Sequence, residues 1–151
     1  EKIPDITIRS TFITGFPGET PEDFAQLKAF VQDMEFDRVG VFAFSEEEGT
    51  PAEKMDGKVP EEVKQARKNE VMRLQQKISL DKNRKKLGKT VQVLCEGSER
   101  SGRYYIGRTA GDSPEIDCCV LFEGKPTKQG EYVMVQIQQA KEYELLGSRM
   151  D

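Results

Sequence analysis

Apolar positions in the first half of the chain follow three successive patterns. Phe12 and Ile13 suit a buried strand over residues 10–14, residues 24–34 repeat apolar side chains at helical spacing, and residues 39–44 are apolar almost throughout. A strand that is apolar throughout is expected to be covered on both faces of its sheet. The three patterns predict a β-α-β unit with a parallel sheet. Ligands of such sheets bind at the carboxyl ends of the strands.

A glycine-rich turn joins the first predicted strand to the helix. Gly15 and Gly18 permit a tight turn and a close approach of a ligand to the backbone. Thr20 is placed to cap the helix, with Pro21 at its first position. A phosphate-binding loop is excluded because no Lys-Ser/Thr pair follows the second glycine, and Glu19 would put a carboxylate where the phosphate sits. On the residues alone, a simple turn remains the alternative to a ligand site.

The second half begins with a long helix and continues as short strands. The helix is predicted from Val59 to Leu87, with acidic residues in its first turn and basic residues near its end, as the helix dipole favours. The basic end is a solvated terminus or, less favoured, a nucleic-acid contact. Five strands with turn residues between them predict a small antiparallel, OB-like barrel. The strands are expected at 90–96, 103–109, 118–122, 132–137 and 143–146.

Composition restricts the classes of function. The net charge is −4, which does not suggest a general nucleic-acid binder. Neither a long apolar run nor a signal peptide is apparent, so we expect a cytoplasmic protein without a membrane association. Cys95, Cys118 and Cys119 lack metal-ligand spacing and the chain has no histidine, so we interpret them as small apolar residues and expect no metal site. Because one β-α-β unit cannot close a barrel, we expect the chain to be part of a longer protein.

Residues 11–20 resemble a late segment of the barrel of radical S-adenosylmethionine enzymes. Ile13, Gly15 and Glu19 match the pattern G-x-I-x-G-x-x-x-E of that family, in which a strand ends beside the cofactor. Residues 36–52 are similar to the methylthiotransferase branch of the family. The resemblance implies that residues 1–86 are the C-terminal portion of a (β/α) barrel with a long terminal helix.

The resemblance also implies the cofactors and their contacts. The full-length enzyme would use S-adenosylmethionine and two 4Fe-4S clusters, whose cysteines lie outside this chain, so the chain alone is expected to be inactive and to bind neither. Glu19 would either contact the cofactor or stabilise the start of the helix that follows it, and the two roles are equally favoured. Glu46, Glu47 and Glu48 are interpreted as a solvated loop and not as a metal site. The implied cofactor-binding residues are Gly15, Phe16, Pro17, Gly18, Glu19, Phe42 and Phe44, and no catalytic residue is assigned.

The second half resembles a TRAM domain, a small barrel appended to tRNA-modifying and related enzymes. Residues 88–94, 107–109 and 130–135 carry this similarity, which implies a TRAM domain over 87–147 and a tail over 148–151. The acidic stretch 112–117 is similar to methylthiotransferases of the RimO type, which add a methylthio group to the β-carbon of an aspartate on a small-subunit ribosomal protein by radical chemistry. Relatives that act on tRNA lack this stretch.

Charge favours the protein substrate over tRNA. Residues 87–151 contain eight Lys and Arg against ten Asp and Glu, whereas phosphate backbones are bound through basic residues. Substrate recognition is assigned to Arg108, Asp112, Glu115 and Asp117; alternatively, these acids cap a loop. A tRNA methylthiotransferase and a non-enzymatic nucleic-acid or ribosome-binding adaptor remain as alternatives. Self-association through the exposed edge of the incomplete first barrel is a further expectation.

Overall fold

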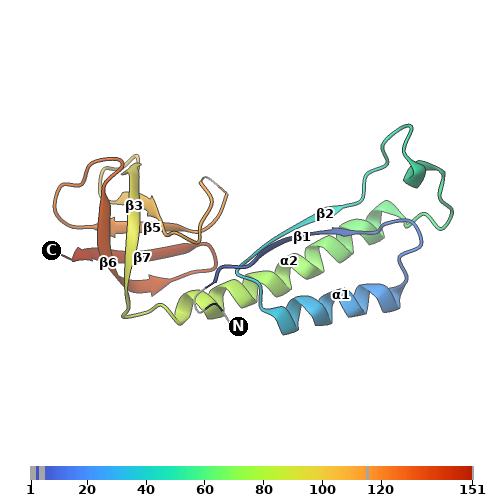
Figure 1. Cartoon of the computed structure of the whole chain (residues 1–151), viewed down its shortest axis with the longest axis horizontal. Coiled ribbons are helices and arrows are strands. Elements are labelled where there is room, and N and C mark those ends of the chain that lie inside the picture. Colours follow the sequence, from blue (N-terminus) through green and yellow to red (C-terminus); the bar gives the residue numbers. More distant parts are fainter. Residues whose placement is uncertain (1–2, 4–5, 115, 151) are drawn as a thin grey trace. The chain divides into compact units, whose positions relative to one another are not determined.

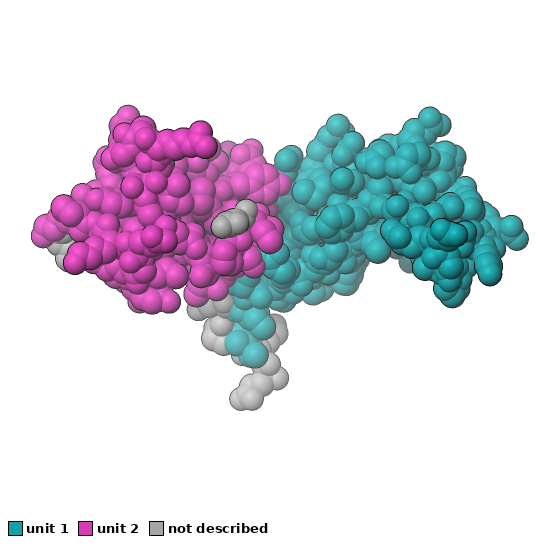
Figure 2. Space-filling view, turned by 90° about the horizontal axis from the view of Figure 1, so that it is seen from above, with its two compact units in different colours: residues 1–78 teal, residues 79–151 magenta. Residues whose placement is uncertain are grey.

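The computed structural model describes residues 3, 6–114 and 116–150. The chain divides into two compact units, residues 1–78 and residues 79–151, which are coloured separately in Figure 2. We refer to them as the β-α-β unit and the barrel unit. The long helix crosses the boundary, so its last turns are counted with the barrel unit.

The β-α-β unit has the predicted order. Strand β1 (Arg9–Thr14) leads into helix α1 (Pro21–Met34), strand β2 (Arg38–Ala43), the short 3₁₀ helix η1 (Pro51–Lys54) and helix α2 (Glu61–Arg84). The two strands are parallel, with Arg9 opposite Arg38 and Thr14 opposite Ala43. Both strands therefore present their carboxyl ends to the loops that begin at residues 15 and 44.

The two helices lie on the same side of this two-stranded sheet (Figure 1). The core between sheet and helices consists of buried apolar side chains from both helices, β2 and the residues before it: Phe24, Val31, Phe36, Val41, Val71 and Ile78. The opposite face of the sheet is open, since Ile13 is 55% exposed and Phe42 is 60% exposed. The expectation that residues 39–44 are covered on both faces is wrong for this chain, because α1 and α2 cover only one face.

The buried side of α2 also differs from the predicted apolar stripe. Val63, Ala66, Val71, Leu74 and Ile78 recur at helical spacing and predict an apolar stripe. Ala66 is nevertheless exposed, whereas Lys64 and Gln75 are 7% and 2% exposed. These two residues share a face with Val71 and Ile78 at helical spacing. The helix thus buries two polar side chains, and the Gln75 amide donates a hydrogen bond of 2.9 Å to the Phe36 carbonyl.

The barrel unit forms the predicted five-stranded barrel. Its strands are β3 (Thr90–Ser98), β4 (Tyr105–Arg108), β5 (Cys119–Glu123), β6 (Tyr132–Ala140) and β7 (Glu144–Met150). They close in the order β3-β4-β5-β7-β6. Figure 1 labels β3, β5, β6 and β7. The expectation of a wholly antiparallel barrel is wrong at one place, because β5 and β7 pair in parallel. Residues 148–150, expected in a tail, extend β7 and pair with β6.

Glycine allows two pairs of strands to approach closely in the barrel. A Cβ at Gly147 would lie 2.2 Å from the Gln136 carbonyl oxygen, and one at Gly107 would lie 2.4 Å from the Leu94 carbonyl oxygen. Neither neighbour can move easily, because both are strand backbone. The core inside the barrel is formed mainly by branched apolar residues: Val93, Cys95, Cys118, Val120, Phe122, Val133, Val135, Ile137 and Leu145.

Candidate functional site

The glycine-rich turn after β1 has the geometry of a type II turn. The Glu19 N–H donates to the Phe16 carbonyl at 2.9 Å, which places Pro17 and Gly18 at the central positions. Gly18 has φ +86°, the conformation that this turn type requires after its proline. The Gly18 N–H donates to the Gly57 carbonyl at 2.9 Å. The turn is therefore fixed both by its own residues and by the segment before α2.

The start of α1 is a capping box. The Thr20 hydroxyl accepts a hydrogen bond from the Asp23 N–H at 3.1 Å, and the Asp23 carboxylate accepts from the Thr20 N–H at 2.9 Å. These bonds to the Thr20 backbone and hydroxyl hold the pKa of Asp23 below its ordinary value. Thr20 and Pro21 have the roles predicted for them. Asp23, and not Glu19, completes the cap.

Gly15 accommodates a lysine side chain of α2. It has φ +77°, and a Cβ at this position would lie 2.3 Å from Cγ of Lys64. Thr14, which is fully buried, donates from its hydroxyl to the Lys64 carbonyl at 3.2 Å. The close approach expected at Gly15 is thus made here by α2, which packs against the carboxyl end of β1.

Lys64 is a buried cation at the carboxyl edge of the sheet, and the sequence reasoning missed it. Its side chain is 9% exposed and its Nζ donates to the Phe44 carbonyl at 3.2 Å. The same Nζ lies 3.5 Å from the Glu61 carboxylate and 5.4 Å from the centre of the Phe44 ring. Its position seven residues before Val71, on the core-facing side of α2, was the available signal. A lysine there is buried only if it finds partners.

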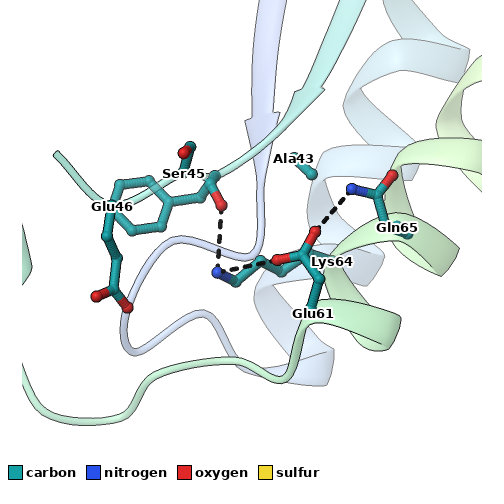
Figure 3. Close-up of a pocket in the computed structure, with 7 residues that line it drawn as sticks. Ala43, Ser45, Glu46, Glu61, Lys64 and Gln65 are labelled. Atoms are coloured by element: carbon teal, nitrogen blue, oxygen red, sulfur yellow. Dashed lines mark hydrogen bonds and ion pairs between the residues drawn. The ribbon is translucent and has the colours of Figure 1, made fainter.

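An open pocket of about 560 Å³ adjoins this cation. Figure 3 shows Lys64 between the end of β2 and Glu61, which α2 contributes. A hydrogen bond from the Gln65 amide, assisted by the nearby Lys64 charge, lowers the pKa of Glu61. The pocket combines one buried ammonium with two carboxylates and backbone groups. Its lining residues are Ala43, Phe44, Ser45, Glu46, Glu61, Lys64 and Gln65.

Glu19 is engaged by a second cation of α2. Its carboxylate and its carbonyl both accept hydrogen bonds from the Arg67 guanidinium, and the two side chains are 13% and 11% exposed. The guanidinium also lies 5.3 Å from the centre of the Phe24 ring. This geometry gives Glu19 a structural role that was not predicted, because Glu19 attaches the turn to α2 and does not complete the cap of α1. Its contact with the cofactor stays a prediction.

The predicted cofactor residues form two groups. Phe16 and Phe44 bring the two loops together, with ring centres 5.1 Å apart in an edge-to-face arrangement. Gly15 and Gly18 lie in the same turn as Phe16. Phe42 belongs to the open face of the sheet, opposite Ile13 in the register and directly before Ala43, which lines the pocket. The carboxyl edge thus offers a turn, an aromatic pair and a polar pocket.

The acidic stretch of the barrel unit is largely occupied with its own loop. Asp112 is 4% exposed, and its carboxylate accepts from the Thr109 N–H at 3.1 Å and from the Thr109 hydroxyl at 2.6 Å. Asp117 accepts from the Ser113 N–H at 2.7 Å. The geometry supports the alternative in which these acids cap a loop. Glu115, the third predicted acid, lies outside the described residues.

Arg108 is held at the end of β4. Its Nε donates to the Glu96 carboxylate at 2.7 Å and its Nη1 donates to the Asp112 carbonyl at 3.3 Å. The side chain is 28% exposed and borders a small pocket of about 160 Å³. Arg108 therefore remains accessible from outside the barrel, whereas Asp112 does not.

The described residues contain no group of His, Cys, Asp and Glu arranged to hold a metal ion. Cys95 and Cys118 are buried in the barrel core, and Cys119 is half-buried, so that desolvation raises the pKa of its thiol. Among the helices that the structure describes, none has the length and apolar character needed to cross a membrane.

Comparison with known proteins relates the chain to one family. A model of the TRAM domain matches residues 87–150. The chain is 50% identical over 147 residues to ribosomal protein uS12 methylthiotransferase RimO of Pelotomaculum thermopropionicum, covering 96% of the chain and 33% of the relative. Proteins of the same name are 49% identical in Clostridioides difficile, with the same coverage, and 48% identical in Symbiobacterium thermophilum, where 97% of the chain matches 31% of the relative.

The chain thus spans about a third of the length of the curated relatives it matches. Its similarity to them covers both units, because it extends over nearly the whole chain. Residues 87–150 match the TRAM domain family, and nearly the whole chain is similar to about a third of the length of proteins named ribosomal protein uS12 methylthiotransferase RimO.

Proposed function

We propose that this chain is part of a radical S-adenosylmethionine methylthiotransferase that modifies a small-subunit ribosomal protein in the cytoplasm. The observation that carries the proposal is the similarity of both units to proteins named ribosomal protein uS12 methylthiotransferase. In this proposal the β-α-β unit contributes one wall of the cofactor site, and the TRAM domain binds the protein substrate.

The carboxyl edge of the β-α-β unit has groups that suit S-adenosylmethionine. This cofactor has a carboxylate, an ammonium and a sulfonium. The pocket presents the Lys64 ammonium beside the Glu61 carboxylate, and its lining also includes Glu46, whose carboxylate pairs with Lys58 at 2.8 Å. Phe16 and Phe44 offer aromatic surface next to it. When bound, S-adenosylmethionine supplies the radical chemistry of the reaction. The residues of this chain would bind and orient it and exclude water on one side.

The iron-sulfur clusters of the proposed enzyme are not assigned to this chain. Such clusters are held by cysteine thiolates, whereas Cys95 and Cys118 are enclosed by the apolar core of the barrel. Within residues 6–114 and 116–150 no cluster of metal-ligating side chains is present. The residues described do not fit these groups, and we derive no step of the reaction through them.

A protein substrate is favoured over tRNA by the charge of the barrel unit. Residues 87–151 contain two more acidic than basic residues, and binding of a phosphate backbone relies on Lys and Arg. A tRNA-modifying relative would need a basic face on the barrel.

The cofactor part of the proposal can be tested by nuclear magnetic resonance. Because the chain supplies only one wall of the site, it is expected to retain no cofactor on isolation. Titration of the ¹⁵N-labelled chain with a large excess of S-adenosylmethionine should nevertheless shift the amide signals of Gly15, Gly18 and Phe44 and leave the barrel signals unchanged. The Lys64→Met variant should lose these shifts, because the only ammonium in the pocket lining is removed. A Lys128→Met variant, altered in the barrel unit, serves as the control. No shifts in the wild type, or shifts confined to the barrel, would contradict the proposal.

A further inference from the structure

Three rows of side chains cross one outer face of the barrel. The register places Thr90 beside Gln136 and Gln136 beside Ser148 in the first row. The second row consists of Gln92, Met134 and Met150, and the third of Arg108, Leu94 and Tyr132. These positions alternate with the buried core residues of the same strands, so their side chains point outward. We call these nine residues the β3–β6–β7 face.

The β3–β6–β7 face is almost free of charge. One third of the residues of the chain are charged, yet eight of the nine positions are neutral. The exception is Arg108, whose charge is offset by the Glu96 carboxylate at 2.7 Å. Large apolar side chains are nevertheless exposed there: Tyr132 by 65%, Met134 by 44% and Met150 by 45%. Depletion of charge with exposed Tyr and Met is the composition of a protein–protein interface.

A pocket lies at the edge of this face, beside Tyr132. Its volume is about 160 Å³, which suits a single side chain and not an extended ligand. Leu94 and the Tyr132 ring supply its apolar walls, while Gln92 and Arg108 supply polar groups. An exposed aromatic residue next to a pocket is the usual form of a binding hot spot.

We infer that the β3–β6–β7 face is the docking surface for an uncharged segment of a protein partner, anchored at Tyr132. A nucleic acid is disfavoured, because the face offers no surplus of positive charge to phosphates. The neutral face instead complements a neutral segment. The identity of the partner, the small-subunit ribosomal protein, rests on the proposed function. In this inference the β3–β6–β7 face, and not the acidic stretch 112–117, is the binding element.

The test measures binding of the whole chain to ribosomal protein uS12 by titration calorimetry. The Tyr132→Ser variant is expected to raise the dissociation constant by about tenfold or more. Its fold is checked by circular dichroism, and the wide exposure of Tyr132 predicts an intact barrel. Tyr143→Ser is the matched control, because Tyr143 is 46% exposed in the same unit but outside the face. It should change the constant by less than about twofold.

Salt separates this docking mode from charge-driven binding. Raising the salt from about 50 to about 200 mM should change the dissociation constant of uS12 by less than about threefold, since the face carries little charge. Equal affinities of wild type and Tyr132→Ser would overturn the inference and leave the proposed function standing. Absence of uS12 binding would overturn both.

Two other occupants would also overturn the inference. Binding of tRNA that is weakened by Tyr132→Ser would assign the face to nucleic acid. Wild-type dimers in sedimentation experiments that become monomers in Tyr132→Ser would assign it to a second copy of the chain. Monomeric wild type with Tyr132-dependent uS12 binding supports the inference.

Discussion

The two units of this chain cover their sheets in different ways. In the barrel unit every strand has two neighbours, and its core is enclosed by the sheet itself. In the β-α-β unit each of the two strands has one neighbour, and helices cover only one face. Ile13 and Phe42 are left exposed on the other face.

This difference indicates which interactions stabilise each unit. The barrel unit relies on tightly packed apolar side chains and on glycines that let strands approach closely. In the β-α-β unit, polar side chains of α2 bind the rest of the unit by hydrogen bonds. Lys64 bonds with Phe44 and Thr14 at the ends of the two strands. Arg67 donates to Glu19, and Gln75 donates to the Phe36 carbonyl. Substitutions inside the barrel should therefore act mainly through packing, whereas several substitutions in the β-α-β unit should act through buried polar partners in addition to packing.

The largest effect is expected from Gly147→Ala in the barrel. The new methyl group would collide with the Gln136 carbonyl of the neighbouring strand, which should lower the free energy of unfolding by about 3 kcal/mol. Urea denaturation followed by fluorescence of the barrel tyrosines measures it. Gly130→Ala is the control, since no atom lies within 4 Å of its added Cβ; its positive φ should cost only about 1 kcal/mol. Equal losses in the two variants would contradict close strand packing.

The next effect is expected from Arg67→Met in the β-α-β unit. It leaves the Glu19 carboxylate, 13% exposed, without its guanidinium partner, and should destabilise this unit by about 2 kcal/mol. Hydrogen exchange of β1 and β2 amides reports the loss locally. The double variant Arg67→Met with Glu19→Gln should recover part of it. Lys28→Met, which breaks the exposed pair with Glu70, should have little effect.

A smaller loss is expected from Asn83→Ala. The Asn83 amide is 1% exposed and donates to the Lys141 carbonyl at 2.9 Å and to the Glu142 carbonyl at 3.2 Å. Removing it takes this donor away from two part-buried carbonyls in the β6–β7 turn and should cost about 1.5 kcal/mol. Exchange rates of the β6 and β7 amides should rise while those of β1 stay constant. Unchanged exchange rates in β6 and β7 would show that the turn is stable without the Asn83 hydrogen bonds.

Phe42→Ala should change the stability of the chain by less than about 0.5 kcal/mol, because the Phe42 side chain is 60% exposed on the open face. The neighbouring Val41→Ala should cost about 2 kcal/mol, since Val41 is 5% exposed and packs in the core. Thermal unfolding compares the two. Similar losses for both variants would indicate that the open face is covered in solution.

The smallest effects concern pH. Bonds from the Lys128 N–H and the Arg149 guanidinium hold the pKa of Glu131 below its ordinary value, as the Thr20 cap does for the pKa of Asp23. The unfolded chain therefore binds protons more readily at these groups. Their stabilisation is complete above the ordinary values and is lost as the pH falls through the lowered folded values. Carboxyl ¹³C titration should give a pKa below 4.5 for Glu131 and below 3.8 for Asp23. A pKa at the ordinary value of either group would contradict these contacts.

Local pattern was sufficient for much of this structure. The cap at Thr20 and Pro21, the order of the first unit and the presence of five barrel strands were predicted, because each depends on residues close in sequence. The tertiary contacts of the predicted site residues could not be predicted in this way. Pattern placed Gly15 and Glu19 in the turn, but it did not show that Lys64 and Arg67 meet them, since these partners lie some fifty positions away.

By itself, the sequence determined the order of the strands and of the two long helices, where α1 is capped and which family the chain resembles, but it did not indicate η1. Only the tertiary structure decided which side of α2 is buried, that β5 and β7 run in parallel, that Asp112 points into its own loop, and that the β3–β6–β7 face is neutral. The physical reason is that periodicity records the alternation of apolar and polar positions within an element. Partner, register and burial of a polar side chain are set by segments that become neighbours only on folding.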